Sequence, residues 1–550
     1  MNKILGIVKN IFEKKFGNLI SLTLLNFSIF GFMRYFSGRY INYPFYIKSF
    51  KFIMAFFSFI IFFTLIYFLL NLINKRLSDV ILKFYTIVSY VLFIVDFLIL
   101  KEFNLYISTS TIQILSETNK NEATEFLSSY LDLKSLVLVL FLCIIIYLFS
   151  KIKIKIYSRK VLYFLLFLMI VQLSLVKENK KILSRTPLGR VYVGVKDVEN
   201  NKKVYKELAK KINSDVKILA NEENIKNIVF VIGESTTRNH MSLYSYNKKT
   251  SPNLERIREN GNLFVFDDVI SPHGYTMASL QKVLTFYNRE SSKEWWQHNN
   301  IIDIMKAAGY YTYWFSNQDT NGFAANIGKR ANLFLWNNIL DDKEFETKIG
   351  NFDGEIVEKS KFKIDKDTKN FVCYHLIGTH SEFDKRYPKE FDYFKDEDYD
   401  KKLSDKKRKA FKTYDNAIRY NDYVIKKIID IYKNQDSIII YISDHAEDLY
   451  ELGYKGHGEG RLSRYTVEIP MIIYVSNEFK KNHPLILNKI RNSTHRPYVT
   501  DDLIHTILDI DGIKTEEFDE SRSLINENFN SSRKRILKGK SYDEYYKINQ

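Results

Sequence analysis

Residues 225–238 read I-K-N-I-V-F-V-I-G-E-S-T-T-R, an apolar run that ends in a glycine and a carboxylate. A β-branched run without helical periodicity predicts a buried strand, most at home in a parallel sheet covered on both faces. We expect Gly233 to let the chain turn sharply, which would present Glu234 in the crevice where open α/β sheets bind ligands. By itself the pattern is more often a strand end with a solvated acid.

A second apolar run also ends in side chains that bind metals. Ser437–Ile442 reads S-I-I-I-Y-I and is followed by Ser443-Asp444-His445. If both strands end at the same edge of one sheet, two carboxylates (Glu234 and Asp444) and one imidazole (His445) meet there. Mixed oxygen and nitrogen ligands with one open position suit a catalytic Zn²⁺, although Mn²⁺ would also accept them.

From Ile225 onward the pattern alternates between strands and helices. An apolar stripe within 407–431 predicts a scaffold helix, and alternating βα units predict a mostly parallel sheet covered on both faces. The other expected strands are Tyr310–Phe315, Phe371–Ile377 and Met471–Val475.

The stretch Ser271–Leu280 (S-P-H-G-Y-T-M-A-S-L) reads as a polar turn followed by the start of a helix. Thr276 or Ser279 could lie at that N-terminus, where backbone N–H groups and the helix dipole favour a phosphate. A cation lowers the pKa of a bound hydroxyl, whose oxygen could then attack phosphorus and form a covalent intermediate. From spacing alone, Thr276 is more often an ordinary N-cap.

Three further histidines accompany these stretches. His380 follows the strand in F-V-C-Y-H-L-I-G-T-H, and His457 lies in the loop G-H-G-E-G. Either could protonate a leaving alcohol or hold phosphate oxygens, although a loop histidine is usually only solvated. We expect His375, within the strand, to be structural.

The first third of the chain is far more apolar than the rest. Five stretches approach or exceed the roughly 17–25 apolar residues that cross a bilayer. A removable signal peptide would explain only the first, and the alternative is buried helices of a soluble protein. The stretches are Phe16–Met33, Phe52–Ile73, Val80–Leu100, Ser135–Ser150 and Val161–Val176.

Positive charge in the loops indicates the orientation. Lysines before the first span, Lys75 with Arg76, and the basic segment 151–160 share one side, taken as cytoplasmic, while basic residues within 34–51 oppose this bias. An odd number of spans then places the carboxyl-terminal domain outside. We expect a transmembrane domain over 1–176, a connector near the bilayer over 177–224 and a catalytic domain over 225–550.

The chain has 550 residues and a net charge of +17, with the lysines scattered along it. This pattern does not indicate nucleic acid, and it would suit an anionic membrane surface. With only Cys143 and Cys373, an intrachain disulfide is not expected. The predicted outer loop over 101–134 fits two readings about equally: a helix capped by Thr118 with Asn121 and Glu122 in its first turn, or acids that contact a cationic lipid head group.

The ordered series G-E-S-T-T-R-N-H-M-S-L-Y-S-Y, T-S-P-N-L, Y-T-M-A-S-L-Q-K-V-L-T-F, H-L-I-G-T-H, S-D-H-A-E-D and G-H-G resembles the membrane phosphoethanolamine transferases. These belong to the alkaline phosphatase/sulfatase superfamily. The resemblance covers nearly the whole chain, and it implies five spans and an outward hydrolase-like domain. Two departures are Ala446, where many relatives have glycine, and the absence of the several cysteines found in some relatives.

The resemblance assigns roles to individual residues. It implies that Glu234, Asp444 and His445 bind zinc and that Thr276, at the metal, is the nucleophile that carries phosphoethanolamine. The implied substrate-binding residues are His380, His457, Glu447, Asn119, Glu122, Asn317 and Gln318.

The activity implied is transfer of phosphoethanolamine from phosphatidylethanolamine to lipid A or lipopolysaccharide core, by a monomer in a bacterial inner membrane whose catalytic domain faces the periplasm. A sulfatase would need C/S-x-P-x-R for formylglycine, which the region 276–280 lacks. A phosphoglycerol transferase would share the fold and zinc site. A receptor without activity is hard to reconcile with an intact set of ligands and nucleophile.

Overall fold

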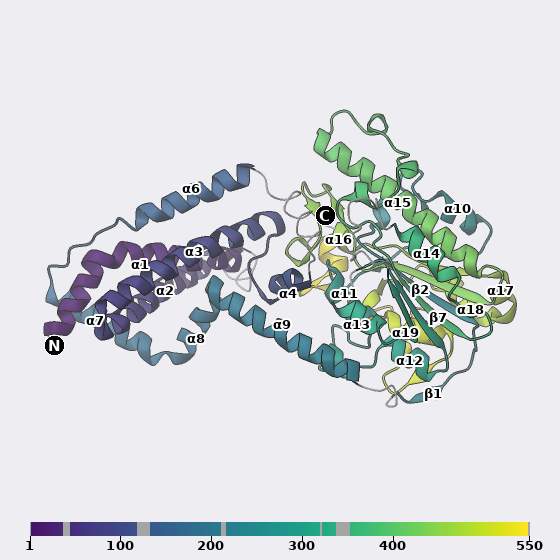
Figure 1. The fold of residues 1–550 in the computed structure, drawn as a ribbon, viewed down its shortest axis with the longest axis horizontal. Coiled ribbons are helices and arrows are strands. Elements are labelled where there is room, and N and C mark those ends of the chain that lie inside the picture. Colours follow the sequence, from purple (N-terminus) through teal and green to yellow (C-terminus); the bar gives the residue numbers. More distant parts are fainter. Residues whose placement is uncertain are drawn as a thin grey trace, which may run out of the picture. The chain divides into compact units, whose positions relative to one another are not determined.

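The computed structural model describes residues 2–36, 44–117, 133–210, 216–318, 322–336 and 352–547. It divides into two compact units, Met1–Lys203 and Val204–Gln550 (Figure 1). Asn119 and Glu122, predicted to contact a lipid head group, lie outside the described residues. Both cysteines are free.

The regular elements among the described residues of the amino-terminal unit are all helices. Asn74 separates two long helices, and its side chain accepts the Leu77 N–H at 3.1 Å, which caps the second of them. The helices are α1 (Asn2–Phe36), α2 (Phe45–Ile73), α3 (Lys75–Phe103), α4 (Thr109–Glu117), α6 (Leu133–Phe149), α7 (Arg159–Ser174), α8 (Val176–Arg185) and α9 (Pro187–Lys210).

Within the described residues, three helices are long and apolar enough to cross a membrane: α1, α2 and α3. They contain the first three predicted spans. The fourth and fifth correspond to α6, of 17 residues, and α7, of 16 residues. Helix α7 joins α8 at a bend of 86°, and together they make at most one further span. The number five therefore remains a prediction.

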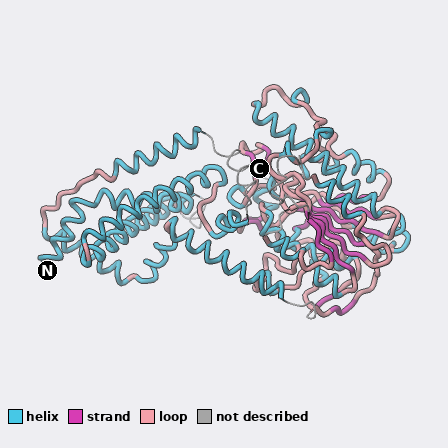
Figure 2. Tube along the Cα trace, viewed as in Figure 1, coloured by secondary structure: helices cyan, strands magenta, loops and turns pink. Residues whose placement is uncertain are grey.

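The carboxyl-terminal unit is built on a seven-stranded sheet, shown in magenta in Figure 2. Its five expected strands are β2 (Asn227–Gly233), β5 (Tyr311–Ser316), β7 (Asn370–His375), β8 (Ser437–Ser443) and β11 (Met471–Val475). Two short strands were not anticipated: β3 (Leu263–Phe266) and β6 (Leu333–Trp336).

The sheet is mixed, with the strand order β3-β11-β8-β2-β7-β5-β6. Strands β8, β2, β7, β5 and β6 pair in parallel, whereas β11 is antiparallel to both of its neighbours. After β8 the chain forms loops and short elements and then enters β11 directly. A parallel neighbour would need a crossover back to the other end of the sheet. The chain instead enters β11 from the end at which β8 finishes, so β11 runs antiparallel to β8.

Helices cover both faces of the sheet, because alternate strand residues point to opposite sides. Ile228, Phe230 and Ile232 of β2 belong to one apolar core, while Val229 and Val231 belong to the other. The first core is covered by α11 (Thr276–Val283), α12 (Ile301–Ala307), α13 (Phe323–Gly328), α17 (Asn477–Asn482), α18 (Pro484–Asn492) and α19 (Leu503–Ile510). The second is covered by α10 (Pro252–Glu259), α14 (Asp353–Lys361) and α15 (Asp405–Tyr432), the predicted scaffold helix.

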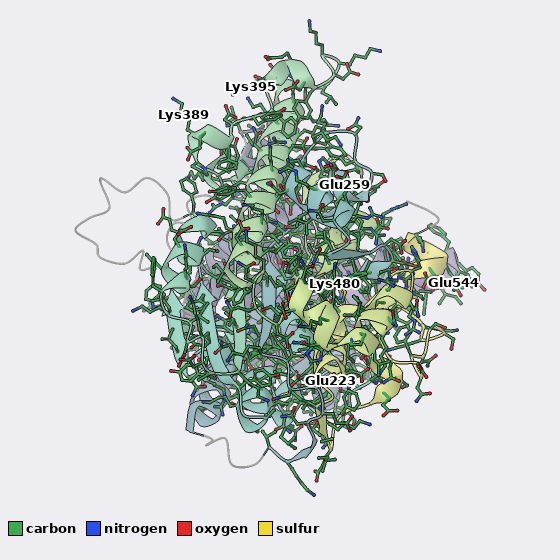
Figure 3. The ribbon with its side chains drawn as sticks, turned by 90° about the vertical axis from the view of Figure 1, so that its right-hand side faces the viewer. Glu223, Glu259, Lys389, Lys395, Lys480 and Glu544 are labelled. Carbon is green, nitrogen blue, oxygen red and sulfur yellow. The ribbon has the colours of Figure 1, made fainter. Side chains whose placement is uncertain are left out.

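Short elements complete the unit at the ends of the sheet. After β2 comes η2 (Arg238–His240), and between β8 and β11 come β9 (Asp448–Leu449), β10 (Lys455–Gly456), η8 (Glu459–Arg461) and α16 (Arg464–Val467). The remaining short strands pair as β1 (Ile218–Ala220) with β13 (Lys514–Thr515), β4 (Val269–Ile270) with β12 (Tyr498–Val499), and β14 (Ile536–Leu537) with β15 (Lys540–Ser541). Charged side chains such as Lys389, Lys395 and Glu544 are exposed on the outside (Figure 3).

Candidate metal centre and nucleophile

Glu234 follows β2 directly and is 2% exposed. The left-handed residue of this turn is Ser235 (φ 55°), and its hydroxyl donates to Glu234 Oε1 at 2.8 Å. Gly233 is needed for a different reason than expected. A Cβ at this position would lie 2.6 Å from the Tyr441 hydroxyl, so glycine provides space here and Ser235 makes the turn.

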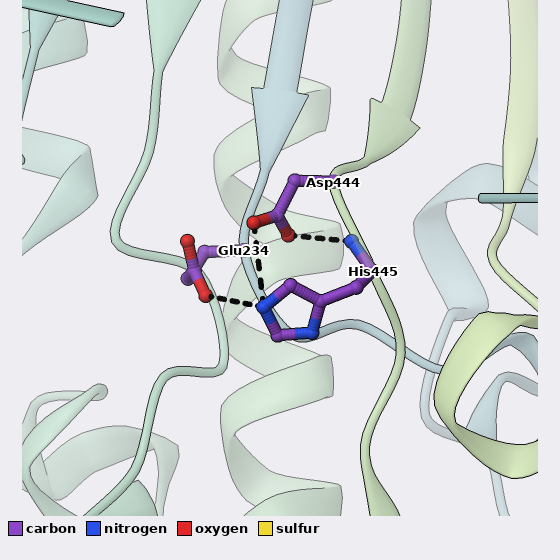
Figure 4. Close-up of side chains that lie close together, drawn as sticks. All are labelled: Glu234, Asp444 and His445. Carbon is purple, nitrogen blue, oxygen red and sulfur yellow. Dashed lines mark hydrogen bonds and ion pairs between the residues drawn. The ribbon is translucent and has the colours of Figure 1, made fainter. Parts of the chain in front are cut away.

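Asp444 and His445 follow β8, the neighbour of β2, so all three side chains meet at one edge of the sheet (Figure 4). Asp444 Oδ1 accepts the backbone N–H groups of Ser235 at 3.1 Å and His445 at 2.7 Å. Asp444 Oδ2 is buried, has no hydrogen-bond partner among the described residues, and lies 3.4 Å from His445 Nε2. This orphaned oxygen points to a missing ligand, because buried acceptors are normally paired.

Thr276 is the first residue of α11, and Tyr275 is the N-cap. The threonine hydroxyl turns toward the acids: Oγ1 lies 3.4 and 3.3 Å from the two carboxylate oxygens of Glu234 and 3.3 Å from His445 Nε2. Thr276 is therefore not the ordinary N-cap that spacing alone favoured. Its oxygen forms the fourth corner of the cluster.

The distances between these atoms fit a tetrahedral ion. Ligands about 2.0–2.2 Å from a tetrahedral Zn²⁺ lie about 3.3–3.6 Å from one another. The separations within the cluster are 3.3 Å (His445 Nε2 to Glu234 Oε1), 3.4 Å (His445 Nε2 to Asp444 Oδ2) and 3.3–3.4 Å from Thr276. The separations from Thr276 are longer than ordinary hydroxyl hydrogen bonds, which are usually about 2.7–2.8 Å long, and they fit ligands that share one ion. Among the described residues, the ligand atoms of Glu234, Asp444 and His445 all lie within 4.8 Å of one another, close enough to bind one metal ion.

The electrostatics call for positive charge at the same point. Burial, together with the charge of Glu234, raises the pKa of Asp444 to about 7. Although burial opposes its charge, the neighbouring carboxylates raise the pKa of His445 to about 10. In the absence of an ion the imidazolium is thus the counter-charge for two buried acids. A divalent cation would neutralise both acids and leave His445 neutral, as a metal-binding imidazole must be.

Two of the predicted substrate-binding residues flank the cluster. The His457 ring packs on the His445 ring with centroids 4.1 Å apart, and His457 Nδ1 pairs with the buried carboxylate of Glu447. His380 is close enough for the charge of Glu234 to act on it, and burial lowers the pKa of His380 to about 4. A neutral imidazole at neutral pH can donate from one nitrogen and accept at the other.

Other candidates have different partners. Gln318 Nε2 lies 3.4 Å from Glu234 Oε2 and donates to the Leu376 carbonyl at 3.0 Å, so this amide faces Glu234. Asn317 is buried and donates to Asp353 Oδ1 at 2.8 Å, behind the site. Ser279, the alternative nucleophile, is fully buried and donates to the His273 carbonyl at 3.2 Å. His375 is buried with its ring against Trp314.

The sequence reasoning missed the residues that hold Glu234 in position. Thr379 donates to the Glu234 carbonyl oxygen from both its N–H and its hydroxyl, each at 3.0 Å. The buried Tyr414 hydroxyl donates to the Ser235 carbonyl at 2.7 Å and accepts the Thr237 N–H at 2.9 Å. Both lie in stretches with other sequence signals, since Thr379 is next to His380 and Tyr414 is on the apolar stripe of α15.

The model of the sulfatase family matches residues 226–513, more than half of the chain. The chain belongs to the sulfatase family. One relative is phosphoethanolamine transferase EptC of Escherichia coli K12, which is 28% identical to this chain over 461 residues. The alignment covers 77% of this chain and 78% of that protein. The resemblance drawn from the sequence motifs is thereby confirmed.

Solved structures agree on the fold of this sulfatase-family chain. The crystal structure of the C-terminal periplasmic domain of EptC from Escherichia coli in complex with Zn matches with a TM-score of 0.53 at 29% identity, over 59% of this chain and 92% of that one. The integral membrane protein lipooligosaccharide phosphoethanolamine transferase A (EptA) from Neisseria meningitidis matches with a TM-score of 0.60 over 92% of this chain and 97% of that one. At 17% identity the second likeness concerns the fold alone.

Proposed function

We propose that this protein transfers phosphoethanolamine from phosphatidylethanolamine to an outer glycolipid, lipid A or lipopolysaccharide core, through a phospho-threonine at Thr276. The observation that carries the proposal is the cluster of four atoms: the Thr276 hydroxyl lies 3.3 Å from His445 Nε2 and within 3.4 Å of both Glu234 oxygens, next to the unpaired Asp444 Oδ2. The phosphoethanolamine transferases named EptC, similar over most of their length, support the transferred group.

Glu234, Asp444 and His445 would hold a Zn²⁺ ion, and the Zn complex of the Escherichia coli EptC domain supports this choice. When bound, the cation would lower the pKa of the Thr276 hydroxyl and offset negative charge on the phosphate. The chain's own contribution is to keep the three ligands buried and oriented before substrate arrives. Ser235 and Thr379 do so for Glu234, and two backbone N–H groups do so for Asp444.

The proposed reaction has two half-reactions. In the first, Thr276 Oγ1 loses its proton and bonds to phosphorus, the bond from phosphorus to the glycerol oxygen breaks, and diacylglycerol leaves with a proton. In the second, an oxygen of the glycolipid loses its proton and bonds to phosphorus, the bond from phosphorus to Thr276 Oγ1 breaks, and Thr276 regains a proton. His457 and His380, beside the cluster, are suited to hold phosphate oxygens and to donate the proton to the leaving alcohol.

The N-terminal α1–α3 support a membrane location for the enzyme. We propose five spans in a bacterial inner membrane and a catalytic domain that faces the periplasm, with the connector over 177–224 between them. The protein would act as a monomer, with Glu447 and Gln318 near the donor. Asn119 and Glu122 would meet the lipid head group from the outer loop.

The decisive test is Thr276→Ala in the full-length protein. We expect transfer to be abolished, while bound zinc and the unfolding midpoint stay near those of the wild type, because three ligands remain. Residual transfer above about a tenth of the wild-type rate would move the nucleophile to Ser279, for which Ser279→Ala is the matched variant. Mass spectrometry of lipid A and core oligosaccharide from cells with and without the protein identifies the acceptor. A gain of phosphoglycerol instead of phosphoethanolamine would refute the proposed donor.

A further inference from the structure

The position of Thr276 depends on a loop without regular structure. Residues 271–275 connect β4 to α11, and Thr276 is the first helical residue after them. On one side the Ser271 N–H donates to the Val467 carbonyl at 2.9 Å. On the other, the hydroxyls of Ser271 and Ser279 both donate to the His273 carbonyl, at 2.7 and 3.2 Å. His273 is thus the point in the loop on which these contacts converge.

The side chain of His273 contacts a residue outside the loop. His273 Nδ1 lies 2.7 Å from Glu459 Oε1, and the Gly274 N–H donates to the same oxygen at 3.4 Å. The backbones also approach closely here, since a Cβ on Gly274 would lie 3.4 Å from the backbone of Gly458. One carboxylate oxygen therefore binds two consecutive residues of the loop that precedes the nucleophile.

Glu459 belongs to the segment that carries the active-site histidine. It begins η8, two residues after His457, whose ring packs on His445 and pairs with Glu447. The His273–Glu459 pair therefore joins the loop that precedes Thr276 to the segment that carries His457. In the part of the chain that the structure describes, Glu459 bonds to His273, Gly274 and Lys538 and not to the four atoms of the cluster.

We infer that His273 and Glu459 form a positioning pair, which fixes Thr276 relative to the metal ligands and to His457. The inference rests on the proposed function, which it deepens by naming what orients the nucleophile. Misplacing a reacting atom by about 1 Å can cost about 100-fold in rate even when the change lies away from the chemistry. Loss of the pair should therefore slow attack on phosphorus and leave donor binding and metal content nearly unchanged.

The first half-reaction gives a direct measurement. Full-length protein in detergent is mixed with dioleoyl-phosphatidylethanolamine micelles without acceptor, and the phosphoethanolamine adduct on the protein is followed by intact mass. For Glu459→Ala we expect the single-turnover rate to fall by about 10- to 100-fold, the donor concentration for half-maximal rate to change by less than about threefold, and zinc content to stay at the wild-type level. Glu459→Gln keeps an oxygen acceptor for His273 and Gly274, so its rate should lie within about fivefold of the wild type.

A double-mutant cycle tests whether the two residues act together. His273→Ala should resemble Glu459→Ala, and the double variant should be no slower than the slower single variant. The control is His495→Ala, which removes a histidine–carboxylate pair with Asp267 of similar length (2.5 Å) that lies on the surface, with side chains 84% and 51% exposed. We expect the control to react at the wild-type rate.

Three results would overturn the inference: a Glu459→Ala rate within twofold of the wild type, additive single-variant effects, or a rate loss that follows loss of zinc. Failure of the proposed function looks different. In that case wild-type protein forms no adduct on Thr276, or Thr276→Ala still transfers, whatever the behaviour of Glu459.

Discussion

Replacing Gly378 by alanine should displace Glu234, the proposed metal ligand. Gly378 has a left-handed backbone (φ 51°), and a Cβ there would lie 2.8 Å from both the backbone nitrogen and the backbone oxygen of Glu234. Carbon atoms do not approach backbone atoms so closely, so one of the two chain segments must move. The next residue, Thr379, provides the two 3.0 Å hydrogen bonds to the Glu234 carbonyl, and these would be lost or lengthened.

The size of the effect follows from these contacts. A non-glycine residue in the left-handed region costs about 1–2 kcal/mol. Two hydrogen bonds at about 1 kcal/mol each bring the expected destabilisation to about 3–4 kcal/mol. Gly453 provides the matched control, because it is also left-handed (φ 86°) but has no atom within 4 Å of its added Cβ. Gly453→Ala should therefore cost only the backbone contribution, about 1–2 kcal/mol.

Both variants can be compared by denaturant unfolding of the detergent-solubilised protein. The four tryptophans of the chain, at 295, 296, 314 and 336, all lie in the catalytic unit, so their fluorescence reports its unfolding. We expect Gly378→Ala to lose about 2 kcal/mol more than Gly453→Ala and also to bind less zinc. If the two variants unfold within about 0.5 kcal/mol of each other and bind equal zinc, Gly378 does not set the position of Glu234.

Three further outcomes are expected. Although burial opposes its charge, the carboxylates of Asp415 (2.7 Å) and Glu451 (3.3 Å) raise the pKa of His240 to about 9. Because the folded pKa exceeds the ordinary 6.5, this stabilisation is complete below pH 6.5 and is lost as the pH rises through 9, by at most about 3 kcal/mol. The variant His240→Gln should flatten this decline of the unfolding free energy with pH. An unchanged dependence of unfolding free energy on pH would contradict the ion pair. Asp444→Asn should reduce bound zinc, measured by elemental analysis, because an amide oxygen carries no charge to hold the ion, and full zinc occupancy would remove Asp444 from the ligand set. Tyr414→Phe leaves the Ser235 carbonyl and the Thr237 N–H unpaired in the core, so we expect a loss of about 1–3 kcal/mol in unfolding free energy, and a loss below about 0.5 kcal/mol would show that water replaces the hydroxyl.

Part of the site was accessible from the sequence because strand ends are visible in it. Apolar β-branched runs ending in Gly-Glu and Ser-Asp-His predicted two buried strands with ligands after them, and β2 and β8 lie side by side with these residues at one edge. Short strands such as β6 escaped notice because four residues carry too little periodicity to separate a strand from a loop. Likewise, the local sequence pattern did not distinguish Gln318 from Asn317. In the structure Gln318 faces Glu234, whereas Asn317 faces Asp353.

By itself the sequence determined the residue types available for chemistry, the apolar helices of the amino-terminal unit and the αβ alternation of the catalytic unit, because these are properties of neighbours along the chain. Only the tertiary structure decided which of two hydroxyls meets the acids, since Thr276 and His445 are 169 positions apart. It also decided that Ser235 makes the turn beside Glu234 and that Glu459 contacts the loop before Thr276. Such choices depend on strand order and loop packing, which bring distant segments within a few ångströms and leave no periodic trace in the sequence.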